Sequence, residues 1–163
     1  MILALKKLED CDILLVDRWL QQAHIKKWYD IPGECTVDDW LDEIKARKDA
    51  FAFLNHFIVL NTDKPIGFCQ YYKCADSPEE DWGALPLEGA YCIDYFIGEV
   101  GYLGKGFGTK TIQTLVDTIF SLADARCVVA DVDKDNIASA RALLSAGFKM
   151  YDAERFRYIH YGQ

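Results

Sequence analysis

The chain has 163 residues, of which 51% are hydrophobic, so it can fill the core of one domain without disulfides or metals. Its formal net charge of −8 disfavours a nucleic-acid partner, because affinity for phosphate backbones comes mostly from Lys and Arg. A negative surface attracts cations, which favours a small amine-bearing ligand.

Cysteine usage and hydropathy narrow the class of protein further. The six cysteines form no CxxC pair and have no nearby His at ligand spacing, so no metal site is expected. The N-terminal apolar run is too short for a signal peptide, and no stretch is long enough to span a bilayer. We expect one domain over residues 1–163, an enzyme or binding domain of the cytoplasm with no membrane partner.

The first half of the chain mixes extended and helical patterns. Thr36 is a candidate N-cap with an acid three residues on, which is a capping-box pattern. The polar stretch 75–89 carries two prolines and is predicted to be a loop. Before that loop we expect a strand at 2–8, one or two helices over 11–29, a helix at 36–48, and a hairpin of strands at 52–60 and 65–74.

The second half begins with an apolar strand at 90–97 and a turn, "YLGKGFGTK", at 102–110. A helix follows, because Ile112, Leu115 and Ile119 fall on one face. The remaining elements are a buried strand at 126–132, a helix at 136–147 with Asn136 as N-cap and Gly147 as its end, and two short strands in the tail. The order of elements indicates an α+β domain with a mixed sheet.

The glycines of the turn allow close approach of a ligand, and the following helix N-terminus adds partial positive charge. This combination favours an anion, most naturally a phosphate. A Walker A loop is excluded because Phe107 follows Gly106, and Thr109 stands where a dinucleotide fingerprint would need its last glycine. The alternative is a glycine-rich turn that binds nothing.

Asp94 lies in the strand "YCIDYFI" and is flanked by apolar residues on both sides. A carboxylate buried there is costly unless it is paired or hydrogen-bonded. Asp94 has two possible roles. It can be a structural acid that backbone N–H groups or an Arg stabilise, or it can be a functional acid, and its place beside the phosphate turn favours the functional role.

The strand, the turn and the helix together resemble the pyrophosphate-binding motif of the GNAT superfamily of N-acetyltransferases, with Gly106 and Gly108 at its two small positions. Leu103 replaces the usual Gln or Arg, and "DNIASARALLSAGF" resembles the second signature of the superfamily. The resemblance implies a GNAT-like mixed, mostly antiparallel β-sheet flanked by helices, with a splayed central strand pair and acetyl-CoA as acetyl donor. The implied cofactor-binding residues are Phe96, Ile97, Gly98, Leu103, Gly104, Lys105, Gly106, Phe107, Gly108, Thr109 and Asn136.

Short identities such as "RWLQQAHIKKWY" and "PIGFCQYY" are similar to the aminoglycoside 6'-N-acetyltransferases. That similarity implies a monomer or homodimer that acetylates a primary amine of a cationic small molecule, an aminoglycoside being one candidate, with antibiotic resistance as a consequence. The loop acids Glu79, Glu80, Asp81 and Glu88 do not align clearly with acceptor-binding acids of that family. The implied substrate-binding residues are Trp28, Gln70, Tyr72, Trp82, Asp94 and Asp131.

The mechanism that the resemblance implies is direct transfer, with Asp94 as the base that takes a proton from the amine. Backbone N–H groups around Ile97 and Gly98 would bind the pantetheine arm and polarise the acetyl oxygen. Leu143 stands where the superfamily often has a Tyr that protonates the leaving thiolate, and Tyr151 is a nearby substitute. Two alternatives remain open: acetylation of a protein N-terminus or other amine, and a non-catalytic acyl-CoA-binding module.

Several of these residues also have ordinary structural interpretations. Asp131 can be a solvated strand-end acid, and Asn136 is an N-cap before it is a cofactor contact. The aromatic residues and Gln70 can belong to the core or its rim. The histidines His24, His56 and His160 are interpreted as structural or exposed.

Overall fold

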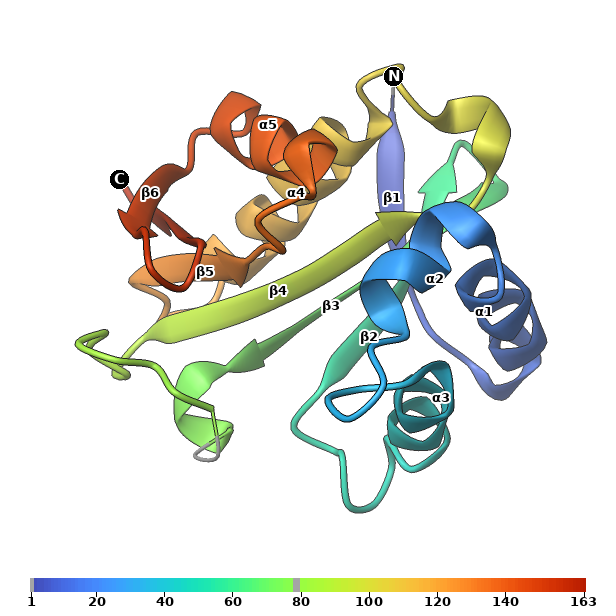
Figure 1. The fold of residues 1–163 in the computed structure, drawn as a ribbon, viewed down its shortest axis with the longest axis horizontal. Helices are drawn as coiled ribbons and strands as arrows, with labels where there is room; N and C mark the ends of the chain where they lie inside the picture. The colour runs from blue at the N-terminus through green and yellow to red at the C-terminus, as the bar shows by residue number, and fades with distance from the viewer. Residues whose placement is uncertain (1, 78–79) are drawn as a thin grey trace.

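The computed structural model describes residues 2–77 and 80–163 (Figure 1), so Glu79 of the predicted loop lies outside the described residues. Within these residues, seven strands form one sheet in the order β1-β2-β3-β4-β5-β7-β6. Neighbouring strands pair antiparallel, except that β4 and β5 pair parallel. The strands are β1 (Leu3–Lys7), β2 (Asn55–Asn61), β3 (Lys64–Lys73), β4 (Ala90–Ile97), β5 (Cys127–Asp131), β6 (Lys149–Asp152) and β7 (Arg157–Tyr161). The expected mixed, mostly antiparallel sheet is confirmed.

The helices follow the predicted patterns closely. The stretch 11–29 forms two helices, and the capping box at Thr36 is confirmed, since its hydroxyl accepts the Asp39 N–H at 3.3 Å. The carboxylate of Asp39 in turn accepts the Thr36 N–H at 2.7 Å. The α-helices are α1 (Ile13–Leu20), α2 (Ala23–Tyr29), α3 (Val37–Lys45), α4 (Phe107–Phe120) and α5 (Ile137–Ser145).

The helices cover both faces of the sheet (Figure 1). Successive strand residues point to opposite faces, so Ile58 packs with α1 to α3 whereas Val59 packs with α4 and α5. Phe68 and Cys69 of β3 divide in the same way. The central strands are therefore buried on both sides, which explains their nearly continuous apolar sequence.

The parallel pair at the centre separates along its length. Residues Ala90 to Cys92 of β4 pair with Cys127 to Val129 of β5, and β4 then continues to Ile97 without that partner. The predicted splayed pair is confirmed by this register. Backbone groups on the β5 side of β4 are therefore directed into the opening between the strands.

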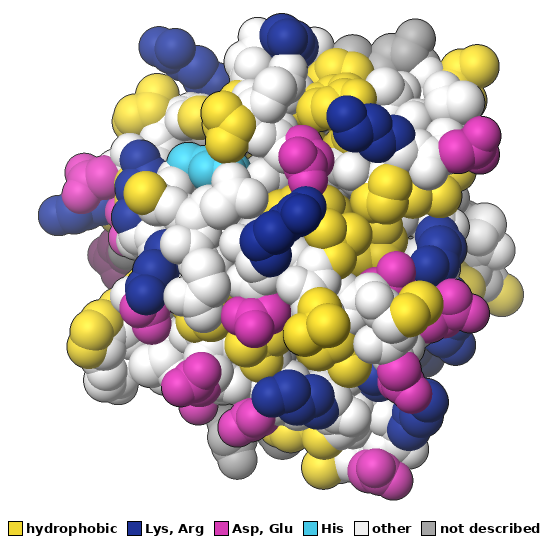
Figure 2. Space-filling model, turned by 90° about the vertical axis from the view of Figure 1, so that its right-hand side faces the viewer, with side chains coloured by type: hydrophobic (Ala, Val, Ile, Leu, Met, Phe, Trp, Pro, Cys, Tyr) yellow, Lys and Arg dark blue, Asp and Glu magenta, His cyan; other side chains and the backbone are white. Residues whose placement is uncertain are grey.

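The charged surface is mixed on the side that carries α1 to α3. Acidic and basic side chains intermingle there, as Figure 2 shows. Among the described residues, no helix is long and apolar enough to cross a membrane.

Candidate active site

A cavity of about 930 Å³ opens where β4 and β5 separate. Its walls come from α2, the second half of β4, the glycine turn, the segment after β5, and α5. The cavity thus brings together the two features that the sequence singled out, the glycine turn and Asp94. Of the predicted site residues, it is lined by Trp28, Asp94, Phe96, Ile97, Leu103, Gly104, Gly106, Gly108, Thr109, Asp131 and Asn136.

The glycine turn presents an open helix N-terminus to the cavity. Gly106 is the N-cap of the 14-residue helix α4 and has a φ of 82°, a backbone conformation that residues with a side chain rarely adopt. No atom lies within 4 Å of where a Cβ would stand at Gly104, Gly106 or Gly108. This space and the unpaired N–H groups of the first helical turn suit a phosphate.

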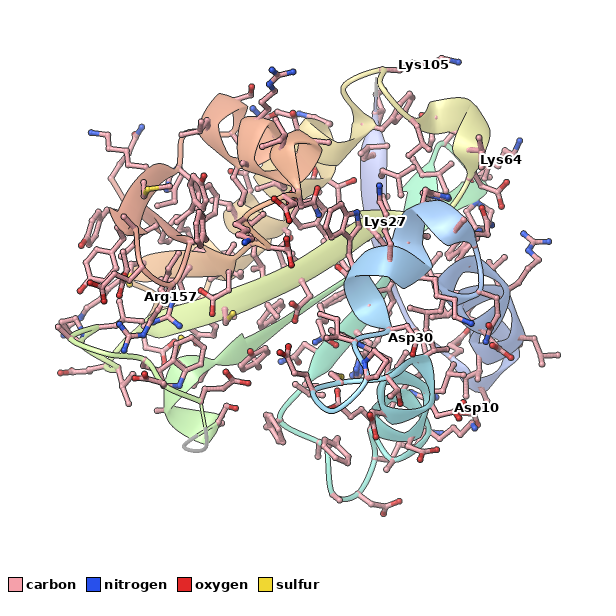
Figure 3. The ribbon with its side chains drawn as sticks, viewed as in Figure 1. Asp10, Lys27, Asp30, Lys64, Lys105 and Arg157 are labelled. Carbon is pink, nitrogen blue, oxygen red and sulfur yellow. The ribbon has the colours of Figure 1, made fainter. Side chains whose placement is uncertain are left out.

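Two predicted residues of the turn face away from the cavity. Lys105 donates to the Gly101 carbonyl at 2.6 Å and lies at the outer rim of the molecule (Figure 3). Phe107 is the first residue of α4 and packs edge-on against Tyr102, with ring centroids 4.9 Å apart. Side-chain contacts of these two residues with a ligand in the cavity are therefore not supported.

The hydrogen bonds between β3 and β4 determine which backbone groups face the opening. The Gly98 N–H donates to the Ile66 carbonyl at 2.8 Å, so the expectation that this N–H is free for a ligand is wrong. In an antiparallel ladder the direction of N–H groups alternates, and the register therefore turns the N–H groups of Ile97 and Tyr95 toward the opening. A Cβ at Gly98 would clash with the Trp19 ring, which explains the glycine.

Asp94 is half-buried, and its carboxylate accepts a 2.8 Å hydrogen bond from the Gln70 side-chain amide. Burial raises its pKa from 3.8 to about 6; the charges of Asp131 and Glu80 add to the rise, and the Gln70 bond opposes it. A carboxylate with such a pKa is mostly ionised at neutral pH and can still take a proton from a reacting group.

Other acids extend the negative region around Asp94. Burial, and then the charge of Asp94, raises the pKa of Glu43 on α3 to about 7. Of the described loop acids, Asp81 pairs with Arg155 at 2.6 Å and Glu88 with Arg126 at 3.1 Å. Glu80 is exposed, and its charge acts on Asp94.

Asp131 lines the cavity and is also part of an ion pair. It accepts two hydrogen bonds from Arg157, at 2.6 Å from Nε and 2.9 Å from Nη2. The Arg157 side chain is 2% exposed and lies 5.0 Å from the centre of the Trp82 ring, beside the loop (Figure 3). The positive charge of Arg157 thus neutralises much of the Asp131 charge.

Three predicted substrate contacts lie behind the cavity wall rather than in it. Gln70 is buried and reaches the cavity through Asp94. Trp82 is buried and donates to the Ser77 carbonyl at 3.0 Å, and Tyr72 packs against it with ring centroids 6.4 Å apart. Their direct contact with a substrate remains a prediction, whereas Trp28 does line the cavity.

The late helix carries its cap as expected. The Asn136 side chain accepts the Ser139 N–H at 3.1 Å, which confirms the N-cap. Leu143 is fully buried in the core between the sheet and α4 and α5. Tyr151 is exposed on β6, outside the residues that line the cavity.

Two residues of α2 complete the site and were not predicted from the sequence. His24 Nε2 lies 3.0 Å from the Ile97 carbonyl, and the Tyr29 hydroxyl donates to the Tyr95 carbonyl at 2.8 Å. Both side chains line the cavity, and they donate to β4 carbonyls that have no β5 partner where the two strands separate. Since these bonds join residues far apart in the chain, no local pattern signals them.

Comparison with known proteins gives a family. The family described as acetyltransferase (GNAT) domain matches residues 9–156. The aminoglycoside N(6')-acetyltransferase type 1 of Klebsiella pneumoniae is 26% identical over 148 residues, which cover 89% of this chain and 73% of that protein. An uncharacterized N-acetyltransferase, p20, of Bacillus licheniformis is 26% identical over 147 residues, covering 88% and 75%.

Solved structures share the fold. A structure of AAC(6')-Ib in complex with ribostamycin and coenzyme A has a TM-score of 0.85 at 22% identity, covering 99% of this chain and 94% of that one. A spermidine N-acetyltransferase of Vibrio cholerae, in complex with CoA and spermine, has a TM-score of 0.70 at 16% identity, covering 96% and 91%.

Proposed function

The chain belongs to the GNAT acetyltransferase family, whose acetyl donor is acetyl-CoA, and we propose that its acceptor is a primary amine of a cationic small molecule. An aminoglycoside is the first candidate, because the Klebsiella pneumoniae relative is an aminoglycoside N(6')-acetyltransferase. The observation that carries the proposal is Asp94, a half-buried carboxylate with a pKa near 6 in the same cavity as the glycine turn.

The glycine turn fits the cofactor's pyrophosphate. Its three glycine positions are open, and the N-terminus of α4 supplies backbone donors and partial positive charge. The N–H groups of Tyr95 and Ile97 would hold the pantetheine arm and the acetyl oxygen in the splay. When bound, acetyl-CoA supplies the activated acyl group.

Asp94 would perform two tasks at the acceptor. Its negative charge attracts the ammonium form of the amine, and its carboxylate then takes a proton, directly or through a water, so that the nitrogen lone pair can attack. Glu80 adds negative potential around it, and Glu43, whose pKa is about 7, adds to this potential in its ionised form, which favours a ligand with several positive charges.

The test is an acceptor panel assayed for CoA release from acetyl-CoA, with mass spectrometry of the products. The panel contains aminoglycosides with a free 6'-amine, aminoglycosides without it, polyamines and short peptides with free N-termini. Acetylation confined to 6'-amines supports the aminoglycoside, and acetylation of polyamines or peptides moves the acceptor to those classes. CoA binding without release for any amine would overturn the enzymatic proposal in favour of an acyl-CoA-binding module.

We infer the cytoplasm as the compartment, since all six cysteines lie among the described residues and are free thiols, as in reducing compartments. For the assembly we keep the expectation of a monomer or homodimer. Sedimentation equilibrium of the purified chain would decide between the two.

A further inference from the structure

We propose that the Tyr95 hydroxyl donates a hydrogen bond to the sulfur of the leaving coenzyme A as negative charge develops there, and that the Ser139 hydroxyl positions it. The inference rests on the proposed function. It starts from a hydrogen bond between strand β4 and helix α5: Tyr95 Oη lies 2.7 Å from Ser139 Oγ. Both residues line the cavity at the splay.

Leu143 stands where the superfamily often has a tyrosine hydroxyl, and the hydroxyl pair of Tyr95 and Ser139 lies beside that position. In a helix, side chains tilt toward the N-terminus, so a side chain at 143 extends over residue 139, four positions earlier. Leu143 occupies the core and offers no proton there. The Tyr95 hydroxyl reaches the same helical turn from the opposite wall, at 3.4 Å from the Ser139 carbonyl.

Two other groups beside β4, one hydroxyl and one imidazole, already have tasks. The Tyr29 hydroxyl donates to the Tyr95 carbonyl, and His24 donates to that of Ile97. When Ser139 Oγ donates to Tyr95 Oη, the Tyr95 hydroxyl is left to donate to the Ser139 carbonyl over a long 3.4 Å contact, and a sulfur anion in the cavity would be a stronger acceptor for it. Burial raises the pKa of Tyr95 to about 12, well above the roughly 8.5 of a thiol, so the hydroxyl keeps its proton and acts as a hydrogen-bond donor.

Asp94 and Tyr95 are neighbours in β4 and therefore point to opposite faces of the sheet. This arrangement separates the base from the hydrogen-bond donor, so the two do not exchange a proton directly. As the amine nitrogen bonds to the acetyl carbon, Asp94 takes the nitrogen's proton. As the carbon–sulfur bond breaks with its electron pair on sulfur, the Tyr95 hydroxyl donates a hydrogen bond to the thiolate, which leaves as thiolate or takes a proton from solvent, and Asp94 returns its proton to solvent after product release.

The first test uses coenzyme A alone and needs no acceptor. The thiol of bound coenzyme A is titrated by thiolate absorbance in the wild type and in Tyr95→Phe. If Tyr95 donates to sulfur, its loss should raise the pKa of the bound thiol by about one pH unit, the effect of one hydrogen bond to a charged group. Tyr91→Phe is the matched control, because Tyr91 lies on the same face of β4, bonds Asp124 at 2.7 Å and does not line the cavity.

The second test uses turnover. Tyr95→Phe should lower kcat by about 10-fold, the effect of one lost hydrogen bond to a developing charge, with coenzyme A affinity unchanged. An acetyl thioester analogue with a more acidic thiol should remove most of this defect, since such a thiolate leaves without help from that hydrogen bond. Ser139→Ala should show the same loss of kcat and the same rescue, both smaller in size. This variant replaces Tyr95→Phe in the test if Tyr95→Phe folds poorly.

Two results would overturn the assignment: a bound thiol pKa in Tyr95→Phe equal to that of the wild type, or a kcat defect that is the same for both thioesters. The thiol titration remains decisive even if every amine in the acceptor panel fails. Failure of the proposed acceptor and failure of the Tyr95 assignment are thus separate outcomes.

Discussion

Gln70 and Asp94 face each other across β3 and β4, and the Gln70 amide donates a 2.8 Å hydrogen bond to the Asp94 carboxylate. The bond favours the ionised form, whereas burial favours the neutral form. The pKa of about 6 is the result of these opposed effects. Gln70 thus controls the pH range in which Asp94 can act as a base, although it does not line the cavity.

We first predict a pH dependence. Because the base must be ionised, kcat/KM should rise as the pH passes through about 6 and level off above it. Gln70→Leu removes a hydrogen bond to the carboxylate. The midpoint of this rise in kcat/KM should therefore move to a higher pH by about 1–2 units, since such a bond is worth about 1.5–3 kcal/mol. The measurement is the pH profile of kcat/KM at saturating acetyl-CoA. An unmoved midpoint would mean that Gln70 does not set the pKa of Asp94.

The second prediction separates catalysis from stability at Asp94. Asp94→Asn keeps the shape but removes charge and basicity, so turnover should fall by about 10²-fold or more while acetyl-CoA binding persists. Because the folded state raises the pKa of Asp94 from 3.8 to about 6, it binds more protons than the unfolded state in that window. Wild-type stability from this group therefore falls as the pH rises from about 4 to 6.

Asn lacks this penalty. Asp94→Asn should consequently match or exceed the wild type in urea stability at pH 7, and its relative advantage should shrink as the pH falls from about 6 to 4. A variant that is inactive and also clearly less stable at neutral pH would instead indicate a structural acid.

Local chemistry explains what could be predicted from the sequence. The caps at Thr36 and Asn136 depend on residues three positions apart, and the glycine turn lies between two strongly patterned elements. Asp94 is recognisable for the same reason, because alternation along one strand already places an acid among apolar neighbours.

Features that depend on pairing between distant segments could not be predicted. The N–H of Gly98 is occupied because the β3–β4 register places it opposite Ile66, and register cannot be derived from a strand alone. Tyr95 and Ser139 are 44 positions apart, so their hydrogen bond has no local signature. The structure likewise pairs Asp131 with Arg157 of another strand, where the sequence shows only a strand-end acid.

The third prediction tests the glycine turn with a pair of matched variants. Gly108 lines the cavity, has an ordinary φ, and has no atom within 4 Å of where a Cβ would stand; the same space surrounds Gly101, which lies outside the cavity. Gly108→Val should therefore fold but obstruct the phosphate, weakening acetyl-CoA binding by at least about 10-fold, or about 1.4 kcal/mol. Gly101→Val should bind normally. Calorimetric titration of both variants with acetyl-CoA checks this, and equal affinities would place the pyrophosphate elsewhere.

The final prediction concerns the ion pair of Asp131 and Arg157. Arg157 is buried whereas the Asp131 side chain is 42% exposed, so the two partners differ in what their removal leaves behind. Asp131→Asn leaves a buried, unpaired cation and should destabilise the fold by about 3–5 kcal/mol. Arg157→Met leaves an acid that water can solvate, at the cost of its bond to the Asp81 carbonyl and its stacking on Trp82.

The double variant should lose less free energy of unfolding than the two single variants lose together, because it contains no unpaired buried cation. Urea unfolding of the four proteins completes the cycle, with KM for the cationic acceptor measured alongside. A structural Asp131 predicts strong coupling in stability and little change in KM once the double variant folds. A stable Asp131→Asn protein with a large rise in KM would instead assign its carboxylate to the acceptor, as the family resemblance implies.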